Sequence, residues 1–305
     1  MKSAITLFLI CCLNMTEAIA KDFIPERSEK NGYVEPFRML DNVFYIGDKW
    51  ASSYLIKTSA GLVLLETLES PFGRWIPDNI KKLGLNPYNI KYILVSHGHS
   101  DHVGNAEYIQ RLYGGKVVMS KEALALAKAQ SEKSTGQGSF HAPEVSLFAE
   151  DGDKLVVGDT EFNFYMTPGH TAGSLSIDFM VKDAGISHRA FMVGGHSPSN
   201  KDIELTRDFI KSMKRIRALA SESPRVSINL ANHPHKNSLF EKRDSGKQDD
   251  GKNYFIDSQG FFDFLDKQEE LGRVKLSALT AEAERSPGPS GLNTMTVQKE
   301  NTASP

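Results

Sequence analysis

Residues 96–104 read Ser-His-Gly-His-Ser-Asp-His-Val-Gly, and they follow the apolar run Tyr-Ile-Leu-Val at residues 92–95. A short aliphatic run that ends in Ser and Gly is typical of a buried strand that leads into a loop. Open α/β sheets hold their ligands outside the carboxyl ends of their strands, so the polar side chains of this loop are expected at such an edge. The stretch therefore predicts an α/β fold with a functional loop after this strand.

The loop carries four side chains that bind metals in proteins, His97, His99, Asp101 and His102. Neutral imidazole suits zinc, and a carboxylate is a further acceptable ligand. On an extended turn His97 and His99 point to the same side, whereas Asp101 and His102 are displaced toward a neighbouring position. An ordinary solvated loop is the alternative, but such loops draw on Gly, Asn, Ser and Pro. The spacing predicts a site for two metal ions.

Hydrophobic periodicity away from the loop predicts alternating strands and helices. The predicted strands are residues 42–47, 52–57, 61–66, 92–95, 116–119, 154–157, 161–167, 174–180, 189–193 and 226–230. The predicted helices are residues 71–83, 103–113, 121–130, 206–219 and 259–270. The elements fall into two blocks, residues 42–131 and 154–230, which predicts an αββα sandwich of two mixed β-sheets with helices on both outer faces.

Two stretches lack this periodicity. Residues 131–150 are polar and Gly-rich, which fits either a solvated loop or a rim or lid over the site. Residues 277–305 are rich in Ala, Glu, Ser, Pro and Gly, and we expect them to form a disordered tail.

The first twenty residues predict export. They contain Lys2, an apolar stretch and an Ala-Ile-Ala sequence at residues 18–20, which together are typical of a signal peptide cleaved after Ala20. The apolar stretch is too short to span a bilayer, so no stable membrane anchor is expected. Both cysteines, Cys11 and Cys12, lie in this segment, so the mature protein is expected to be a periplasmic or secreted chain without disulfides.

Composition limits the kind of partner. The chain has 305 residues, 40% hydrophobic and 24% charged, with a formal net charge of −2. A net charge this close to zero does not indicate a basic surface for nucleic acid or an anionic membrane, so a small-molecule substrate is expected. We expect a monomer.

Three later histidines each follow a predicted strand: His170 in Pro-Gly-His-Thr, His196 in Gly-Gly-His-Ser and His233 in Asn-His-Pro-His. A single histidine is more often an ordinary surface or core residue than a ligand, but the repeated position favours ligands. If these strand ends converge on the first loop, two tetrahedral zinc sites with a bridging water or hydroxide result. The first site would use His97, His99 and His170, and the second Asp101, His102 and His233, with His235 as an alternative to His233.

These motifs resemble a known family. His-x-His-x-Asp-His after a buried strand, followed in order by Pro-Gly-His-Thr and a late histidine, is similar to the signature of the metallo-β-lactamase superfamily. Asn-His-Pro at residues 232–234 and Asn-Tyr-Phe-Ile-Asp at residues 253–257 resemble the third subclass of the class B β-lactamases. The similarity covers about residues 40–273 and implies one hydrolase domain over residues 21–276.

The resemblance implies an activity. It supports the same six ligands and two Zn²⁺ ions, and it implies hydrolysis of the β-lactam amide bond, and thus antibiotic resistance, by a metal-bound hydroxide that Asp101 orients. Ser197, Ser199 and Asn200 are candidates for contact with the substrate carboxylate. The alternatives are a secreted hydrolase of the same fold that acts on a lactone, a thioester or a sulfate or phosphate ester, and a metal-binding scaffold without activity.

Three positions bear on the choice among these activities. Related thioesterases, lactonases and nucleases typically carry a bridging Asp after the strand that ends near residue 193, and here residues 184–201 contain no Asp or Glu. The third subclass usually has Ser where this chain has His196, which could be a seventh ligand, a donor to substrate or a mere neighbour. Glu66 stands where the family usually has an Asp that orients a ligand histidine.

Overall fold

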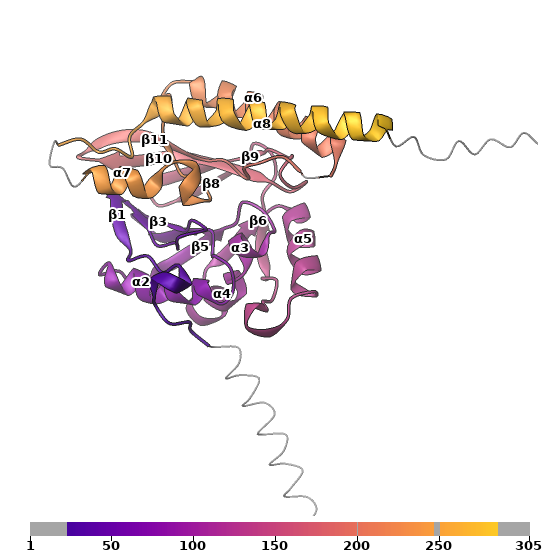
Figure 1. Cartoon of the computed structure of the whole chain (residues 1–305). Helices are drawn as coiled ribbons and strands as arrows, with labels where there is room; N and C mark the ends of the chain where they lie inside the picture. Colours follow the sequence, from indigo (N-terminus) through magenta and orange to yellow (C-terminus); the bar gives the residue numbers. More distant parts are fainter. Residues whose placement is uncertain (1–22, 200, 247–250, 286–305) are drawn as a thin grey trace, which may run out of the picture.

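The computed structural model describes residues 23–199, 201–246 and 251–285. The expected signal peptide and Asn200 lie outside the described residues. Two β-sheets face each other, with helices outside both (Figure 1). This arrangement is the predicted αββα sandwich.

The first sheet has seven strands in sequential order. They are β1 (Phe37–Leu40), β2 (Val43–Tyr45), β3 (Tyr54–Thr58), β4 (Gly61–Leu65), β5 (Ile90–Leu94), β6 (Lys116–Met119) and β7 (Val145–Phe148). The pairs from β1 to β4 are antiparallel and those from β4 to β7 parallel, so the sheet is mixed. Its outer face carries η2 (Phe72–Trp75), α2 (Ile76–Lys82), α3 (Ser100–Val103), α4 (Ala106–Tyr113) and α5 (Lys121–Ser131) (Figure 1).

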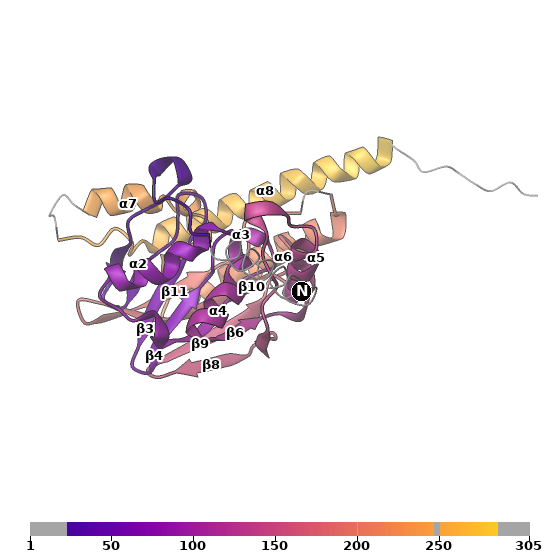
Figure 2. The same ribbon diagram turned by 90° about the horizontal axis from the view of Figure 1, so that it is seen from below.

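The second sheet has five strands in the order β12-β11-β10-β9-β8. They are β8 (Lys154–Val157), β9 (Thr160–Met166), β10 (Leu175–Asp183), β11 (Ile186–Met192) and β12 (Val226–Asn229). Only the β11–β12 pair is parallel. Helices α6 (Ile203–Ser221) and α8 (Ser258–Arg285) lie side by side on its outer face (Figures 1 and 2). Helix α7 (Leu239–Ser245) lies beside β1 of the first sheet (Figure 1).

Buried side chains divide between three layers because successive strand residues point to opposite faces. In β4, Leu65 packs in the core between the sheets and Leu64 packs against the helices of the first sheet. On the other side of the molecule, Phe191 of β11 packs against Phe209 of α6 and Phe261 of α8. The first sheet is thus covered on both faces, as expected for parallel strands.

Three sequence predictions need correction. Residues 131–150 contain β7, whose residues are mostly exposed at the edge of the sheet and therefore show no apolar alternation. The helix expected at residues 103–113 is divided, since α3 ends at Val103 and α4 begins at Ala106. Residues 277–285 do not belong to a disordered tail, because α8 continues to Arg285 through residues that are strong helix formers, Ala, Leu and Glu among them. The rest of the predicted tail, residues 286–305, lies outside the described residues.

The sequence patterns also missed β1, the first strand of the first sheet. Among the residues that the structure describes, no helix has the length and apolar character needed to cross a membrane.

Candidate metal centre

The loop after β5 delivers the first histidines from the carboxyl end of a buried parallel strand. Gly98 separates His97 from His99, and a Cβ atom there would lie only 2.1 Å from the carbonyl oxygen of Ala123 in α5. Only glycine lets the loop pack this closely against α5. His99 then serves as the N-cap of α3, whose first turn contains Asp101 and His102.

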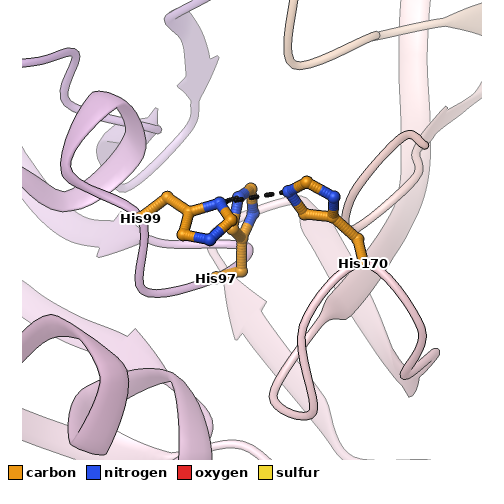
Figure 3. A group of neighbouring side chains, drawn as sticks. All are labelled: His97, His99 and His170. Carbon is orange, nitrogen blue, oxygen red and sulfur yellow. Dashed lines mark hydrogen bonds between the residues drawn. The ribbon is translucent and has the colours of Figure 1, made fainter. Parts of the chain in front are cut away.

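His97, His99 and His170 form a first triad, in which one nitrogen from each ring faces the others (Figure 3). His97 Nε2 and His170 Nε2 each lie 3.1 Å from His99 Nδ1. The second nitrogens of two of these rings are engaged elsewhere: His97 Nδ1 lies 2.9 Å from Ser96 Oγ, and His170 Nδ1 donates to the Ser197 carbonyl at 3.0 Å.

Burial keeps the first triad uncharged. It lowers the pKa of His97 well below its usual value, lowers the pKa of His99, and lowers the pKa of His170 to about 4, with neighbouring histidines adding to the shifts of His97 and His170. Neutral imidazoles present lone pairs, and three lone pairs that converge are suited to one metal ion.

Asp101, His102 and His233 form a second triad beside the first. Asp101 Oδ2 lies 3.3 Å from His102 Nε2 and 3.4 Å from His233 Nε2. His233 comes from the loop after β12, and its Nδ1 donates to the carbonyl oxygen of Trp50 at 2.6 Å. The candidate ligand atoms of each triad lie within 4.8 Å of one another.

Glu66 lies behind His102 and is fully buried. Its Oε2 is 2.7 Å from His102 Nδ1, and its Oε1 accepts the backbone N–H of Ser96 at 2.7 Å. The residue follows β4 in the left-handed conformation, with φ of 64°. The longer side chain thus reaches His102 from the position where the family resemblance implies a shorter Asp.

Carboxylates make the second triad electrostatically different from the first. Burial alone would lower the pKa of His102, but the carboxylates of Asp101 and Glu66 outweigh it and raise the pKa to about 10. Burial would raise the pKa of Asp101, yet His102 and His233 hold it well below its usual value. The pKa of His233 falls to about 4, mainly through burial.

The remaining predicted site residues lie close by but outside both triads. His196 Nδ1 donates to Asn232 Oδ1 at 2.9 Å, and its ring lies 4.4 Å from that of His233 and 6.0 Å from that of His170. The ring of His235 lies 5.8 Å from that of His233. In the described part of the chain, the two groups with metal-binding geometry contain neither His196 nor His235.

Ser197 and Ser199, predicted as substrate contacts, act through their backbones in this structure. The Ser197 carbonyl accepts from His170, and the Ser199 N–H donates to the Gly169 carbonyl at 3.0 Å. These bonds join the loop after β11 to the loop that carries His170.

Trp50 is a site residue that the sequence did not reveal. The carboxylate of Asp48 accepts the N–H groups of Trp50 and Ala51, both at 2.7 Å, and this turn aims the Trp50 carbonyl at His233. Every residue has a carbonyl group, so no sequence signal marks this partner. The Trp50 side chain, 49% exposed, lies against Phe72 with ring centroids 6.1 Å apart.

Comparisons with known proteins agree with this geometry. Residues 49–187 match the model of the metallo-beta-lactamase superfamily. The structure resembles BJP-1, a subclass B3 metallo-beta-lactamase of Bradyrhizobium japonicum, with a TM-score of 0.72 and 27% identity over 82% of this chain and 96% of that one.

Curated relatives cover less of the molecule. A beta-lactamase-like protein 2 homolog of Caenorhabditis elegans is 24% identical over 168 residues, 55% of this chain and 52% of the relative. A hydroxyacylglutathione hydrolase of Maricaulis maris is 31% identical over 107 residues, 35% of each protein. The chain thus spans about half or less of these relatives. Taken with the sandwich and the paired triads, the comparisons show that residues 49–187 match a metallo-β-lactamase superfamily domain and that the fold resembles a subclass B3 enzyme.

Proposed function

We propose that the protein is a two-zinc hydrolase that opens the amide bond of β-lactams. The observation that carries the proposal is the pair of adjacent triads, three imidazoles beside an Asp-His-His group, without an acidic residue at the end of β11. Related thioesterases and lactonases typically carry a bridging Asp after this strand, and here residues 184–201 contain no Asp or Glu. The similarity to a subclass B3 enzyme supports the same reading.

The donor set fits zinc in both triads. Ligand histidines typically donate their outward N–H to a carbonyl or carboxylate, which leaves the other nitrogen for the metal. His170 pairs in this way with the Ser197 carbonyl and His233 with the Trp50 carbonyl, and the Glu66 carboxylate lies 2.7 Å from His102 Nδ1. We propose His97, His99 and His170 as ligands of the first ion and Asp101, His102 and His233 as ligands of the second.

Bound zinc would lower the pKa of a water to about 7 and polarise the substrate carbonyl. The chain then contributes orientation. The Asp101 side chain is 32% exposed, so its carboxylate faces both the second triad and solvent and can orient an attacking water by accepting a hydrogen bond from it. We assign it the catalytic role. Ser197, Ser199 and His196 lie on the loop after β11 and are proposed, together with Asn200 of the same segment, to contact the substrate carboxylate.

We propose a periplasmic or secreted location, since residues 1–20 have the pattern of a signal peptide and β-lactams act outside the cytoplasm. Mass spectrometry of the protein from a periplasmic extract is expected to give a chain that begins at Lys21. A full-length chain retained in the cytoplasm would reject the export proposal.

A thioester is the second candidate substrate. It is favoured by the similarity to a hydroxyacylglutathione hydrolase. Lactones and sulfate or phosphate esters share the same requirement for an activated water and a polarised carbonyl or ester.

A substrate panel tests the proposal. The zinc-loaded mature protein is assayed with nitrocefin, a carbapenem, an acyl lactone, an acylglutathione thioester and aryl sulfate and phosphate esters. The highest kcat/KM is expected for a β-lactam. A higher value for the thioester or another ester would reject β-lactam hydrolysis in favour of that activity. An inert scaffold would turn over none of them, although a chelator would still lower its melting temperature.

A further inference from the structure

Helix α8 reaches the metal centre through the turn that follows β11. We infer that Gln268 of α8 is a positioning residue for the first metal site, acting on His170 through the backbone of Ser197. The inference rests on the proposed metal-dependent function. Neither Gln268 nor α8 belongs to the loops that carry the candidate ligands. Gln268 would therefore support the first metal site from outside those loops.

The first link of this chain of contacts joins His170 to the turn. A carbonyl oxygen only accepts, so the bond from His170 Nδ1 to the Ser197 carbonyl places the ring hydrogen on Nδ1 and leaves the Nε2 lone pair facing His99. The ring also rests on Gly195, where a Cβ atom would lie 2.6 Å from His170 Cδ2. Both the tautomer and the position of the His170 ring therefore depend on residues 195–197.

The second link is the conformation of Ser197. Its φ is 71°, in the left-handed region that residues with a side chain adopt only at a cost. Such a conformation persists only where the surroundings hold it. Here the Ser197 N–H donates to Oε1 of Gln268 at 2.8 Å, and this bond fixes the peptide that precedes the strained residue.

The third link is the rigidity of α8 at this level. Gln268 is only 3% exposed, since it lies on the same buried helix face as Phe261, Phe264 and Leu265. One turn further, a Cβ atom on Gly272 would lie 2.8 Å from Ile210 Cγ1 of α6, so the two helices are in close contact. A buried amide among aromatic side chains is costly unless it is bonded. The bond to Ser197 accounts for a polar residue at this position.

Two single-site backgrounds allow each metal site to be measured alone. Asp101→Ala disables the second triad and leaves the first, whereas His170→Ala does the reverse. Zinc affinity is measured in each by competition with a chromophoric chelator, with and without Gln268→Met, which keeps the side-chain length and removes the acceptor. We expect Gln268→Met to weaken the first site by about 10- to 100-fold and to leave the second within about threefold.

A matched control and a rescue separate positioning from packing. Gln259→Met changes an exposed glutamine of the same helix, which is bonded to Asp263, and is expected to leave both affinities unchanged. Ser197→Gly removes the cost of the left-handed conformation. When Ser197→Gly is added to Gln268→Met, the zinc affinity of the first site is expected to return to within about threefold of its value without Gln268→Met. If Gln268→Met acted only by disturbing the packing of α8, Ser197→Gly would not restore that affinity.

The inference is overturned if Gln268→Met leaves the first site at full affinity, if both sites weaken equally, or if Ser197→Gly gives no rescue. Should Gln268→Met prevent folding, Ser197→Val tests the same link without a change in α8, because a β-branched residue resists positive φ. The same loss confined to the first site is then expected, and full affinity would reject the role. None of these titrations uses a substrate, so the inference can stand even if no β-lactam is hydrolysed.

Discussion

The two triads lie side by side, yet their surroundings give them opposite electrostatic characters. Around the first triad the outer partners of the rings are neutral, a hydroxyl at His97 and a carbonyl at His170, and burial lowers the pKa of every member. The second contains Asp101 and is backed by Glu66, so the pKa of His102 rises to about 10. Similar ligands thus have different protonation states without metal.

This difference implies that the two triads bind a metal ion under different protonation conditions. The first triad is preset to receive a cation, because its imidazoles are already neutral at pH 7. The second must lose a proton from His102 before that nitrogen can bind metal, but its carboxylate then offsets part of the ion's charge. Each prediction below tests one side of this contrast.

Replacement of Asp101 by Ala is expected to have the largest effect. It removes the carboxylate of the second triad and the group proposed to orient the attacking water. We expect kcat to fall by at least about 100-fold and the second metal equivalent to be lost, while the first remains. Turnover and zinc content are measured at limiting zinc. Near wild-type turnover with one bound ion would contradict the two-metal mechanism.

Glu66→Gln is expected to have the next largest effect, since it removes the buried charge behind His102 while it preserves the volume. Second-site zinc affinity should fall by about 10- to 100-fold, and first-site affinity should change little. Glu69→Gln is the matched control, because the Glu69 carboxylate lies near Asp101 and accepts from the Ser100 hydroxyl at 3.4 Å, whereas it is Glu66 that contacts His102. An equal loss in both variants would show that general negative charge matters, and that the specific contact to His102 does not.

The contrast was only partly visible in the sequence. The spacing of His97, His99, Asp101 and His102 predicted two groups, and the family resemblance supported His170 for the first and His233 for the second. The outer partners could not be predicted in the same way, because Trp50 and Ser197 act through backbone carbonyls, which sequence does not distinguish. The contact of Gln268 could not be predicted either, because the sequence pattern of its helix indicated only that an aromatic face is buried.

The fold shows the same limit. Strand β6 and helix α5 were predicted almost to the residue, because an apolar run and an N-cap serine at Ser120 mark them directly. Strand β7 carries mostly exposed residues and is defined by its pairing with β6, a contact between distant segments. Short-range sequence patterns predict elements that have their own buried apolar residues. They miss strands that are defined mainly by pairing with another strand.

The pH dependence of zinc uptake should separate the triads more finely. At pH 7, binding to the second site is expected to release about one proton from His102, whereas binding to the first should release almost none. Calorimetric titration of the single-site variants in buffers of different ionisation enthalpy measures the proton count. Equal release at both sites would remove the proposed contrast.

The metal-free protein should lose stability at both ends of the pH range. The pKa values of His170 and His233 are lowered to about 4, so their contribution is present above about pH 6.5 and is lost as the pH falls through about 4. The pKa of His102 is raised to about 10, so its contribution is present below about pH 6.5 and is lost as the pH rises through about 10. Melting temperatures of the chelator-treated protein across pH 4–10 check both signs, and a monotonic curve would contradict them.

The smallest effect is expected for His235→Asn. His235 is the sequence alternative to His233, but it is His233 whose Nε2 approaches Asp101 and whose Nδ1 is held by the Trp50 carbonyl. Second-site zinc affinity should therefore stay within about threefold in His235→Asn, whereas His233→Asn should lower it by at least about 100-fold, more than loss of an outer partner does. A larger loss in His235→Asn than in His233→Asn would mean that His235 is the third ligand of the second site. The Trp50 carbonyl would then have no role in holding a ligand.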